Sequence, residues 1–112
     1  ALLSLTYGEI AASSYLCELV RRIISETVPI LNKLYHYDLN IEKTVCSVLE
    51  KSAAAGDHEC SMSQDLRNKK RTEIDFLNGA IAELGRKESF NTPVNSTLTM
   101  LIKAKEKMLN AT

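Results

Sequence analysis

The sequence predicts a small all-α domain of about five helices. Apolar residues recur at steps of three and four along most of the chain, and no stretch alternates apolar and polar residues long enough for a strand. The 112 residues include 4 Gly and 2 Pro, which is too few for a turn-rich β-sandwich. Apolar residues make up 45% and charged residues 25%, so we expect a single globular domain over residues 1–112.

The first predicted helix runs from about Glu9 to Tyr35. Its apolar stripe consists of Leu16, Val20, Ile23, Ile24, Thr27, Leu31 and Leu34. The charged residues Glu18, Arg21, Arg22 and Glu26 fall largely off this stripe. Pro29 lies within it and lacks the amide that a helix interior uses, so we expect a kink or a break there.

Two further helices are predicted in the middle of the chain. Asn40 is a favoured N-cap for the second helix, and Gly56 suits the left-handed position that ends it. The apolar face between them contains Ile41, Val45, Val48 and Leu49. A short third helix is expected from about Ser61 to Lys70, with Met62 and Leu66 inward.

The last two predicted helices complete the domain. The fourth runs from about Thr72 to Leu84, with Gly85 as its stop. The fifth begins at Thr92 and Pro93, because Thr can cap a helix and Pro fits its first position. Its inner face is expected to contain Val94, Leu98, Leu101, Ile102, Met108 and Leu109.

Charge and composition exclude several kinds of partner. Basic and acidic residues number 14 each, so no net charge attracts nucleic acid or an anionic membrane. No apolar run approaches the roughly 18 to 20 residues that span a bilayer. Cys17, Cys46 and Cys60 share no CxxC spacing, so we expect free thiols in a reducing cytoplasm and no metal site.

Glu73 is the first candidate functional residue. It lies four residues before Leu77 and eight before Ile81, which places it at the head of an inward stripe. A carboxylate at the rim of a core needs a partner or a ligand, because burial without one costs several kcal/mol. Glu73 could equally cap its own helix or pair with Arg67 or Arg71, and the spacing does not distinguish these roles.

Ser61 is the second candidate. It follows a loop and opens a predicted helix, where Ser is often an N-cap. Its hydroxyl could instead bind a small anionic or polyhydroxy ligand beside the free amides of the first turn. Both roles fit its position.

Three segments resemble a known family. They read Ser-Met-x-Gln-Asp over 61–65, Arg-Thr-Glu-Ile-Asp-x-x-Asn-Gly over 71–79 and Thr-Pro-x-Asn over 92–95. Together with the opening residues 1–10, they resemble the C-terminal domain of ketopantoate reductase (2-dehydropantoate 2-reductase). The resemblance implies a helical bundle like the C-terminal domains of 6-phosphogluconate-dehydrogenase-like enzymes.

The resemblance also implies an activity and site residues. Such enzymes reduce 2-dehydropantoate to (R)-pantoate with NADPH, on the route to pantothenate and coenzyme A, in a cleft between this domain and an N-terminal Rossmann domain. By analogy, Ser61 would bind the substrate, and Glu73 would be a catalytic and cofactor-binding residue near the nicotinamide ribose. Tyr7 and His58 stand where members have substrate-contacting Asn residues, so another 2-keto acid is an alternative substrate.

The resemblance leaves essential parts outside this chain. The family's catalytic Lys and its Gly-rich NADPH-binding turn would precede Ala1, so we expect the chain alone to be inactive. Its expected partners are the Rossmann domain, a 2-keto acid and a second copy in a homodimer. The alternative from a different class is a non-catalytic helical module for protein interaction or self-association.

Overall fold

The computed structural model describes residues 6–110 and confirms the all-α class. Its helices are α1 (Tyr7–Ala12), α2 (Ser14–Tyr35), α3 (Ile41–Ala55), α4 (Ser61–Arg67), the 3-10 helix η1 (Ile74–Phe76), α5 (Asn78–Glu88) and α6 (Pro93–Asn110). Within the described range, the β-pairing consists of one isolated antiparallel bridge between Thr6 and Glu59. The first five residues of the family-like segment 1–10 lie outside this range.

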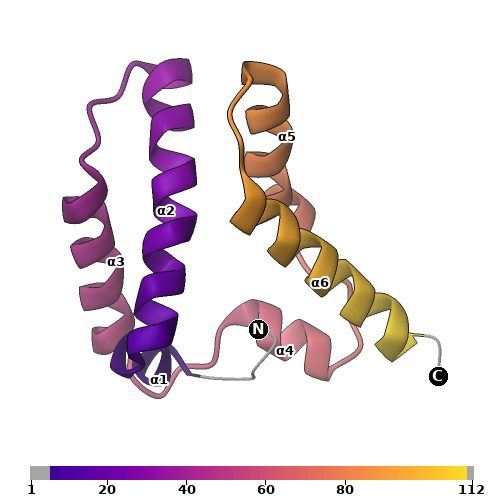
Figure 1. The fold of residues 1–112 in the computed structure, drawn as a ribbon. Coiled ribbons are helices and arrows are strands. Elements are labelled where there is room, and N and C mark those ends of the chain that lie inside the picture. The colour runs from indigo at the N-terminus through magenta and orange to yellow at the C-terminus, as the bar shows by residue number, and fades with distance from the viewer. Residues whose placement is uncertain (1–5, 111–112) are drawn as a thin grey trace.

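The helices form two halves joined along α2. Figure 1 shows α2 and α3 side by side with α1 across one end, and α5 and α6 on the other side of α2. Ile24, Val28 and Val45 form a core between α2 and α3. Leu66, Ile74 and Ile102 form a second core between α4, η1 and α6. The segment that connects the two halves, residues 56–60, runs beside α1.

The first predicted helix is two helices. Ser13 ends α1 in an extended conformation, and its hydroxyl accepts a hydrogen bond from the Leu16 amide (3.3 Å), which caps α2. Of the kink or break expected at Pro29, the break is wrong, because α2 continues through this residue to Tyr35. The helix is interrupted earlier, at Ser13, whose hydroxyl accepts a hydrogen bond from an amide at the start of α2.

The predicted boundaries of the second helix are confirmed. The Asn40 side chain accepts a hydrogen bond from the Lys43 amide (2.9 Å) at the start of α3. Gly56 follows Ala55 with a φ of 53°, a conformation that favours glycine. α3 is therefore held at both ends by the residues that predicted it.

The predicted helix from Thr72 to Leu84 is wrong at both ends. Residues 74–76 form η1, and α5 begins only at Asn78, so Glu73 does not head a helical stripe with Leu77 and Ile81. Gly85 does not stop the helix either, since α5 continues to Glu88 and ends at Ser89 with a φ of 62°. Gly85 is buried, and an added Cβ would lie 2.7 Å from the Thr92 Cγ2 and 3.1 Å from the Phe90 carbonyl oxygen. Glycine at position 85 therefore allows the segment with Phe90 and Thr92 to pack closely against α5.

α6 begins at Pro93 as predicted, but its first amides donate to a group other than the Thr92 hydroxyl. The Thr92 hydroxyl lies 3.2 Å from the Ser96 hydroxyl. The first amides of α6, those of Val94 and Asn95, instead donate to the carboxylate of Glu26 on α2. A residue from another helix therefore supplies the cap.

Candidate functional site

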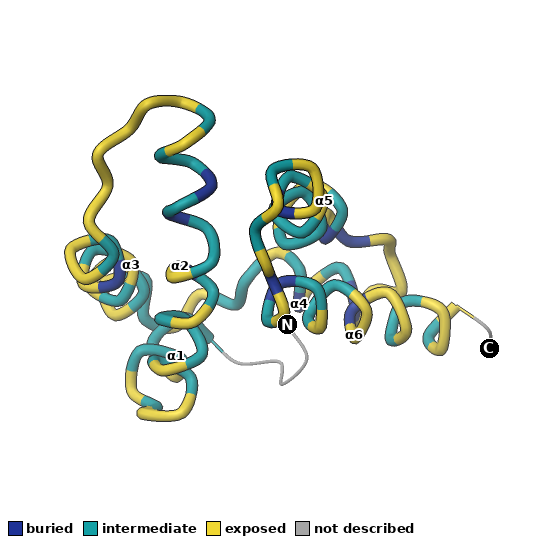
Figure 2. Tube along the Cα trace, turned by 45° about the horizontal axis from the view of Figure 1, so that its top comes forward, coloured by how far each residue is buried: buried dark blue, intermediate teal, exposed yellow. Residues whose placement is uncertain are grey.

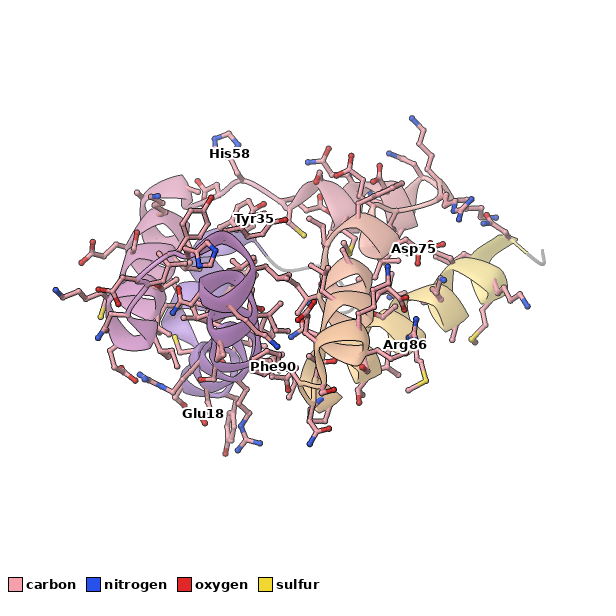
Figure 3. The ribbon with its side chains drawn as sticks, turned by 90° about the horizontal axis from the view of Figure 1, so that it is seen from above. Glu18, Tyr35, His58, Asp75, Arg86 and Phe90 are labelled. Carbon is pink, nitrogen blue, oxygen red and sulfur yellow. The ribbon has the colours of Figure 1, made fainter. Side chains whose placement is uncertain are left out.

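Three of the four predicted site residues lie together where α1 meets the connecting segment. The Tyr7 amide donates to the His58 carbonyl oxygen (3.0 Å), one residue from the bridge between Thr6 and Glu59. Ser61 follows three residues after His58, as the first residue of α4. Ser61 and His58 are exposed and Tyr7 is half-buried. Figure 3 shows the His58 side chain pointing away from the body of the molecule.

The pairing of Gly8 and Gly56 makes this junction possible. The Gly8 amide donates to the Gly56 carbonyl oxygen at 2.8 Å. A Cβ at position 8 would lie 2.9 Å from that oxygen and 3.2 Å from the Gly56 Cα. Such contacts are too short for any side chain, so glycine at position 8 lets α1 reach the backbone that carries His58.

The structure gives Ser61 no capping role. The N-cap of α4 is Cys60, and Ser61 is the first residue inside the helix. The Cys60 thiol donates to the buried hydroxyl of Ser63 (3.3 Å). Its position inside the helix therefore excludes the N-cap role predicted for Ser61, and the residue is exposed.

The Cys60 thiol has a lowered pKa. Burial acts to raise the pKa, but hydrogen bonding to the side chain and backbone of Ser63 lowers it. The two other cysteines are also free thiols, with Cys17 half-buried and Cys46 exposed. The predicted free state is thus found for all three.

Glu73 is exposed between two anchored neighbours. Thr72 is buried, and its hydroxyl donates to Glu106 on α6 (2.5 Å), as does its amide (3.2 Å). Ile74 is 2% exposed in the second core, and its amide donates to the Thr72 hydroxyl (3.3 Å). The backbone on both sides of Glu73 is therefore fixed while its carboxylate faces outward.

The structural roles considered for Glu73 are taken by other groups. Arg67 pairs with Glu59 (2.5 Å), and Arg71 pairs with Asp75 (3.4 Å). Glu73 precedes η1 without a side-chain capping hydrogen bond. It follows the C-terminal end of α4, the short helix that Ser61 opens.

Asp75 is the strongly paired carboxylate of this region. It lies 2.8 Å from the Lys103 Nζ on α6 in addition to its contact with Arg71. The hydrogen bond from Lys103 lowers the pKa of Asp75, partial burial opposes this, and the charges of Lys103 and Arg71 lower it further. Asp75 thus ties η1 to α6 beside Glu73.

Sequence reasoning missed a buried polar chain that positions α5 and α6. Asn95, 1% exposed, donates from its Nδ2 to Glu26 (2.8 Å) and accepts from the Asn78 Nδ2 (2.8 Å). Asn78 is half-buried at the start of α5. The signal that could have found Glu26 is its spacing from the half-buried Ile23 and the buried Ile30, which puts it near the same helix face.

The described residues offer no metal site and no membrane span. Within 6–110, no group of three or more His, Cys, Asp and Glu side chains is arranged to hold a metal ion. No helix in the described part is both long and apolar enough to cross a bilayer. A groove of about 930 Å³ lies along α5 and α6, but its lining includes none of the four predicted site residues.

Solved dehydrogenases have this fold. A ternary structure of D-mandelate dehydrogenase with NADH and anilino(oxo)acetate matches with a TM-score of 0.89 and 30% identity, over 97% of this chain and 60% of that one. A PanE/ApbA family ketopantoate reductase from Ralstonia eutropha JMP134 shares the fold, with a TM-score of 0.83 and 24% identity over 98% of this chain and 36% of that one. The fold is that of the helical C-terminal domain of a dehydrogenase.

Sequence comparison identifies the family. The family model for the ketopantoate reductase PanE/ApbA C-terminal domain matches residues 1–106, and the chain belongs to this family. A 2-dehydropantoate 2-reductase of Streptococcus pyogenes serotype M1 is 42% identical over 111 residues, covering 98% of this chain and 36% of the relative. The Aquifex aeolicus enzyme of that name is 36% identical over 109 residues, covering 95% and 35%. The chain thus spans about a third of the length of these curated relatives.

Proposed function

We propose that the chain is the substrate-binding C-terminal domain of an NADPH-dependent 2-dehydropantoate 2-reductase, a cytoplasmic enzyme that forms (R)-pantoate. One observation carries the proposal: Glu73 is exposed although Thr72 and Ile74 on either side are buried and anchored. An outward carboxylate on a fixed backbone, with its possible arginine partners engaged elsewhere, suits contact with a ligand or a second domain.

Each site residue has a distinct role in this proposal. The Ser61 hydroxyl hydrogen-bonds the 2-keto acid, and the Glu73 carboxylate accepts hydrogen bonds from a ribose or substrate hydroxyl near the reacting carbon. These oxygen groups fit a sugar and a hydroxy acid, whereas no Gly-rich phosphate-binding turn occurs in the sequence. NADPH supplies the hydride when bound, chiefly by an N-terminal Rossmann domain, and the proton-donating Lys lies N-terminal to the first residue of this sequence. The chain alone is therefore inactive.

The substrate has one specific alternative. Tyr7 and His58 replace two family Asn residues at the junction beside Ser61, and both are bulkier and differ in hydrogen bonding. The D-mandelate dehydrogenase with 30% identity was solved with anilino(oxo)acetate, a 2-keto acid derivative that carries an aromatic ring. A reductase for another 2-keto acid is therefore the second candidate within the same class.

The test is NADPH oxidation by the enzyme that contains both this chain and its N-terminal Rossmann domain. We expect turnover of 2-dehydropantoate to fall about a hundredfold in Glu73→Ala and about tenfold in Ser61→Ala. Circular dichroism should show unchanged folding in both. Ser14→Ala and Glu50→Ala, which change exposed residues of α2 and α3, are the matched controls. Full activity in both site variants would refute the assigned roles.

Substrate choice is measured on the same protein. The ratio of kcat/KM for 2-dehydropantoate to that for an aryl 2-keto acid separates the two candidates. Tyr7→Asn and His58→Asn should shift this ratio toward 2-dehydropantoate if the two side chains set specificity. An unchanged ratio would remove them from the substrate site.

A non-catalytic interaction module is the candidate from another class. Large apolar side chains that are exposed on α6 favour an association surface, and a homodimer belongs to the proposed function as well. A parent gene without an upstream GxGxx(G/A) turn, together with no turnover, would favour the module over the reductase.

A further inference from the structure

The turn that carries Glu73 is held by one side of α6. The Glu106 carboxylate accepts hydrogen bonds from the Thr72 hydroxyl (2.5 Å) and the Thr72 amide (3.2 Å), immediately before Glu73. Two residues after Glu73, the Asp75 carboxylate lies 2.8 Å from the Lys103 Nζ. Lys103 and Glu106 are three residues apart, which makes them neighbours on the helix surface. α6 therefore contacts the chain on both flanks of Glu73.

Apolar packing holds the same turn from the inside. Figure 2 shows buried positions along α6 between exposed ones, and Ile102 is one of the buried residues. Ile74 is 2% exposed and belongs to the core cluster that contains Ile102. Residues 72, 74 and 75 are thus all held by α6, and within 72–75 Glu73 is the exposed residue.

The backbone of η1 also restricts the direction of the Glu73 side chain. The Phe76 amide donates to the Glu73 carbonyl oxygen (2.9 Å), which closes a 3-10 turn. Side chains three residues apart in such a turn lie on the same side, and Phe76 is 82% exposed. Glu73 and Phe76 therefore both face away from the buried Ile74. A carboxylate on a backbone held in this way loses little freedom when it binds a ligand.

Stability alone is a weak reason for the contact between Lys103 and Asp75. The two side chains are 53% and 37% exposed, and ion pairs with this exposure contribute little to the free energy of unfolding. The contact does restrict where the turn lies relative to α6. Such restriction suits a functional carboxylate, which must be held within about 0.5 Å of its productive position by groups that do not themselves bind the ligand.

We propose that Lys103 and Glu106 are positioning residues for Glu73, because one turn of α6 fixes both flanks of the segment that presents the Glu73 carboxylate. The inference rests on the proposed function, in which this carboxylate accepts hydrogen bonds from a ribose or substrate hydroxyl. Glu106 acts through Thr72 and Lys103 acts through Asp75, and neither touches the ligand.

Steady-state NADPH oxidation by the two-domain enzyme tests Glu106. Glu106→Ala should lower kcat for 2-dehydropantoate about tenfold and change KM less than about threefold, because a displaced carboxylate loses contacts made in the transition state. Glu106→Gln keeps an acceptor oxygen for Thr72 and should retain most of the wild-type kcat. Glu83→Ala, at an exposed residue of α5, is the matched control. Wild-type kcat in Glu106→Ala would overturn the role of Glu106.

The same assay tests Lys103. Lys103→Ala should lower kcat about threefold, less than Glu106→Ala, because Asp75 keeps its contact with Arg71. Lys103→Arg retains a cation that can reach Asp75 and should restore most of the activity. Lys107→Ala, at an exposed residue one turn further along α6, should leave kcat unchanged. Equal kcat in Lys103→Ala and Lys107→Ala would remove Lys103 from the positioning of Glu73.

A double-mutant cycle separates positioning from a general structural defect. If Glu106 acts through Glu73, the Glu106→Ala substitution should change kcat less than about twofold once Glu73 is already alanine. A structural defect elsewhere would instead lower kcat by the same factor in both backgrounds. Multiplied losses in the double variant would therefore overturn the inference.

Hydrogen–deuterium exchange of the segment 72–77 reports on the turn independently of activity. The Phe76 and Leu77 amides close η1, and we expect them to exchange at least about tenfold faster in Glu106→Ala than in the wild type. Full activity in Glu73→Ala would refute the proposed function, while faster exchange would still support the hold of α6 on the turn. Unchanged exchange in both Glu106→Ala and Lys103→Ala would overturn the inference whatever the kinetics.

Discussion

Glu26 on α2 holds the N-terminus of α6 through Asn95. The two carboxylate oxygens of Glu26 accept from the Val94 amide (2.8 Å), the Asn95 amide (3.0 Å) and the Asn95 Nδ2 (2.8 Å). Asn95 continues the chain to Asn78 at the start of α5. A carboxylate at a helix N-terminus satisfies free amides and complements the helix dipole. This contact therefore joins the two halves of the domain and sets where α5 and α6 lie.

Removing the Glu26 carboxylate should destabilise the whole domain. We expect Glu26→Ala to lower the free energy of unfolding by about 3 kcal/mol, because it leaves the backbone amide of the buried Asn95 without an acceptor and its Nδ2 with only the Ile23 carbonyl oxygen at 3.5 Å. Glu26→Gln retains one oxygen and should cost about 1 kcal/mol. Urea unfolding followed by circular dichroism measures both.

The control for Glu26 is another glutamate of the same helix. Glu18 pairs with Arg21 and Arg22 at the surface, with 53% of its side chain exposed. Glu18→Ala should therefore cost less than about 0.5 kcal/mol. Equal losses in Glu18→Ala and Glu26→Ala would mean that the clamp on α6 contributes no more than a surface ion pair.

Gly85→Ala should destabilise the protein although alanine favours helices. The added Cβ would lie 2.7 Å from the Thr92 Cγ2 and 3.1 Å from the Phe90 carbonyl oxygen. Overpacking of this kind costs about 1–3 kcal/mol, which outweighs the gain of about 1 kcal/mol in helix propensity. Thermal unfolding gives the sign directly.

Thr92→Ser provides the matched test of the Gly85 contact. It removes the methyl group that meets the new Cβ and keeps the hydroxyl beside Ser96. Gly85→Ala should therefore cost less in the Thr92→Ser background than in the wild type. A stabilising Gly85→Ala in the wild-type background would show that the glycine is replaceable.

Substitutions at the neighbours Thr72 and Glu73 should differ in their effect on stability. Thr72→Val removes the hydroxyl that donates to Glu106 and accepts from the Ile74 amide, and should cost about 1–2 kcal/mol. Glu73→Ala changes an exposed side chain and should alter stability by less than about 0.5 kcal/mol. Denaturant unfolding of the two neighbours measures the contrast. A Glu73→Ala loss as large as that of Thr72→Val would give Glu73 a structural role instead of a functional one.

Asp75 should contribute stability that is lost in acid. Its pKa lies below the ordinary value of 3.8, first because Lys103 donates a hydrogen bond to it. A carboxyl group with a lowered folded-state pKa stabilises the protein above its unfolded pKa, and this contribution disappears as the pH falls below about 3.8 through the folded-state value. NMR titration of the Asp75 carboxyl group should locate its pKa in that lower range.

The pKa of Asp75 should depend mainly on Lys103. Lys103→Ala removes the largest cause of the shift and should raise the pKa of Asp75 toward 3.8, with a smaller effect from Arg71 remaining. Lys43→Ala, at an exposed residue of α3, should leave the titration unchanged. The same pKa in all three proteins would show that α6 does not hold Asp75.

Local signals in the sequence predicted most of the helices. Asn40 and Gly56 mark the ends of α3 because an Asn cap and a left-handed glycine act within a few residues of chain. Pro93 marks the start of α6 for the same kind of reason. Local signals gave the wrong helix end where a contact from another part of the chain sets the structure. Gly85 lies inside a helix because Thr92 and Phe90 approach it too closely for a side chain.

The sequence also predicted which residues of the candidate site to consider, but not what holds them in place. The family-like segments pointed to Ser61 and Glu73, and the structure leaves both exposed. The helical stripe that was meant to place Glu73 does not exist, because η1 replaces the first turn of the expected helix. Glu73 is exposed instead because its neighbour Thr72 is anchored by hydrogen bonds to Glu106. These two residues are 34 positions apart, so no local sequence pattern predicts the contact.

The sequence by itself determined the all-α class, the family and the ends of several helices, since these depend on side-chain periodicity, residue motifs and contacts within a turn. The tertiary structure decided that Tyr7 meets His58, that Glu26 caps α6, and that Met100 and Met108 face outward. Those relationships join residues that are far apart in the chain or depend on which helix face remains uncovered. They follow only from how the two halves pack against α2.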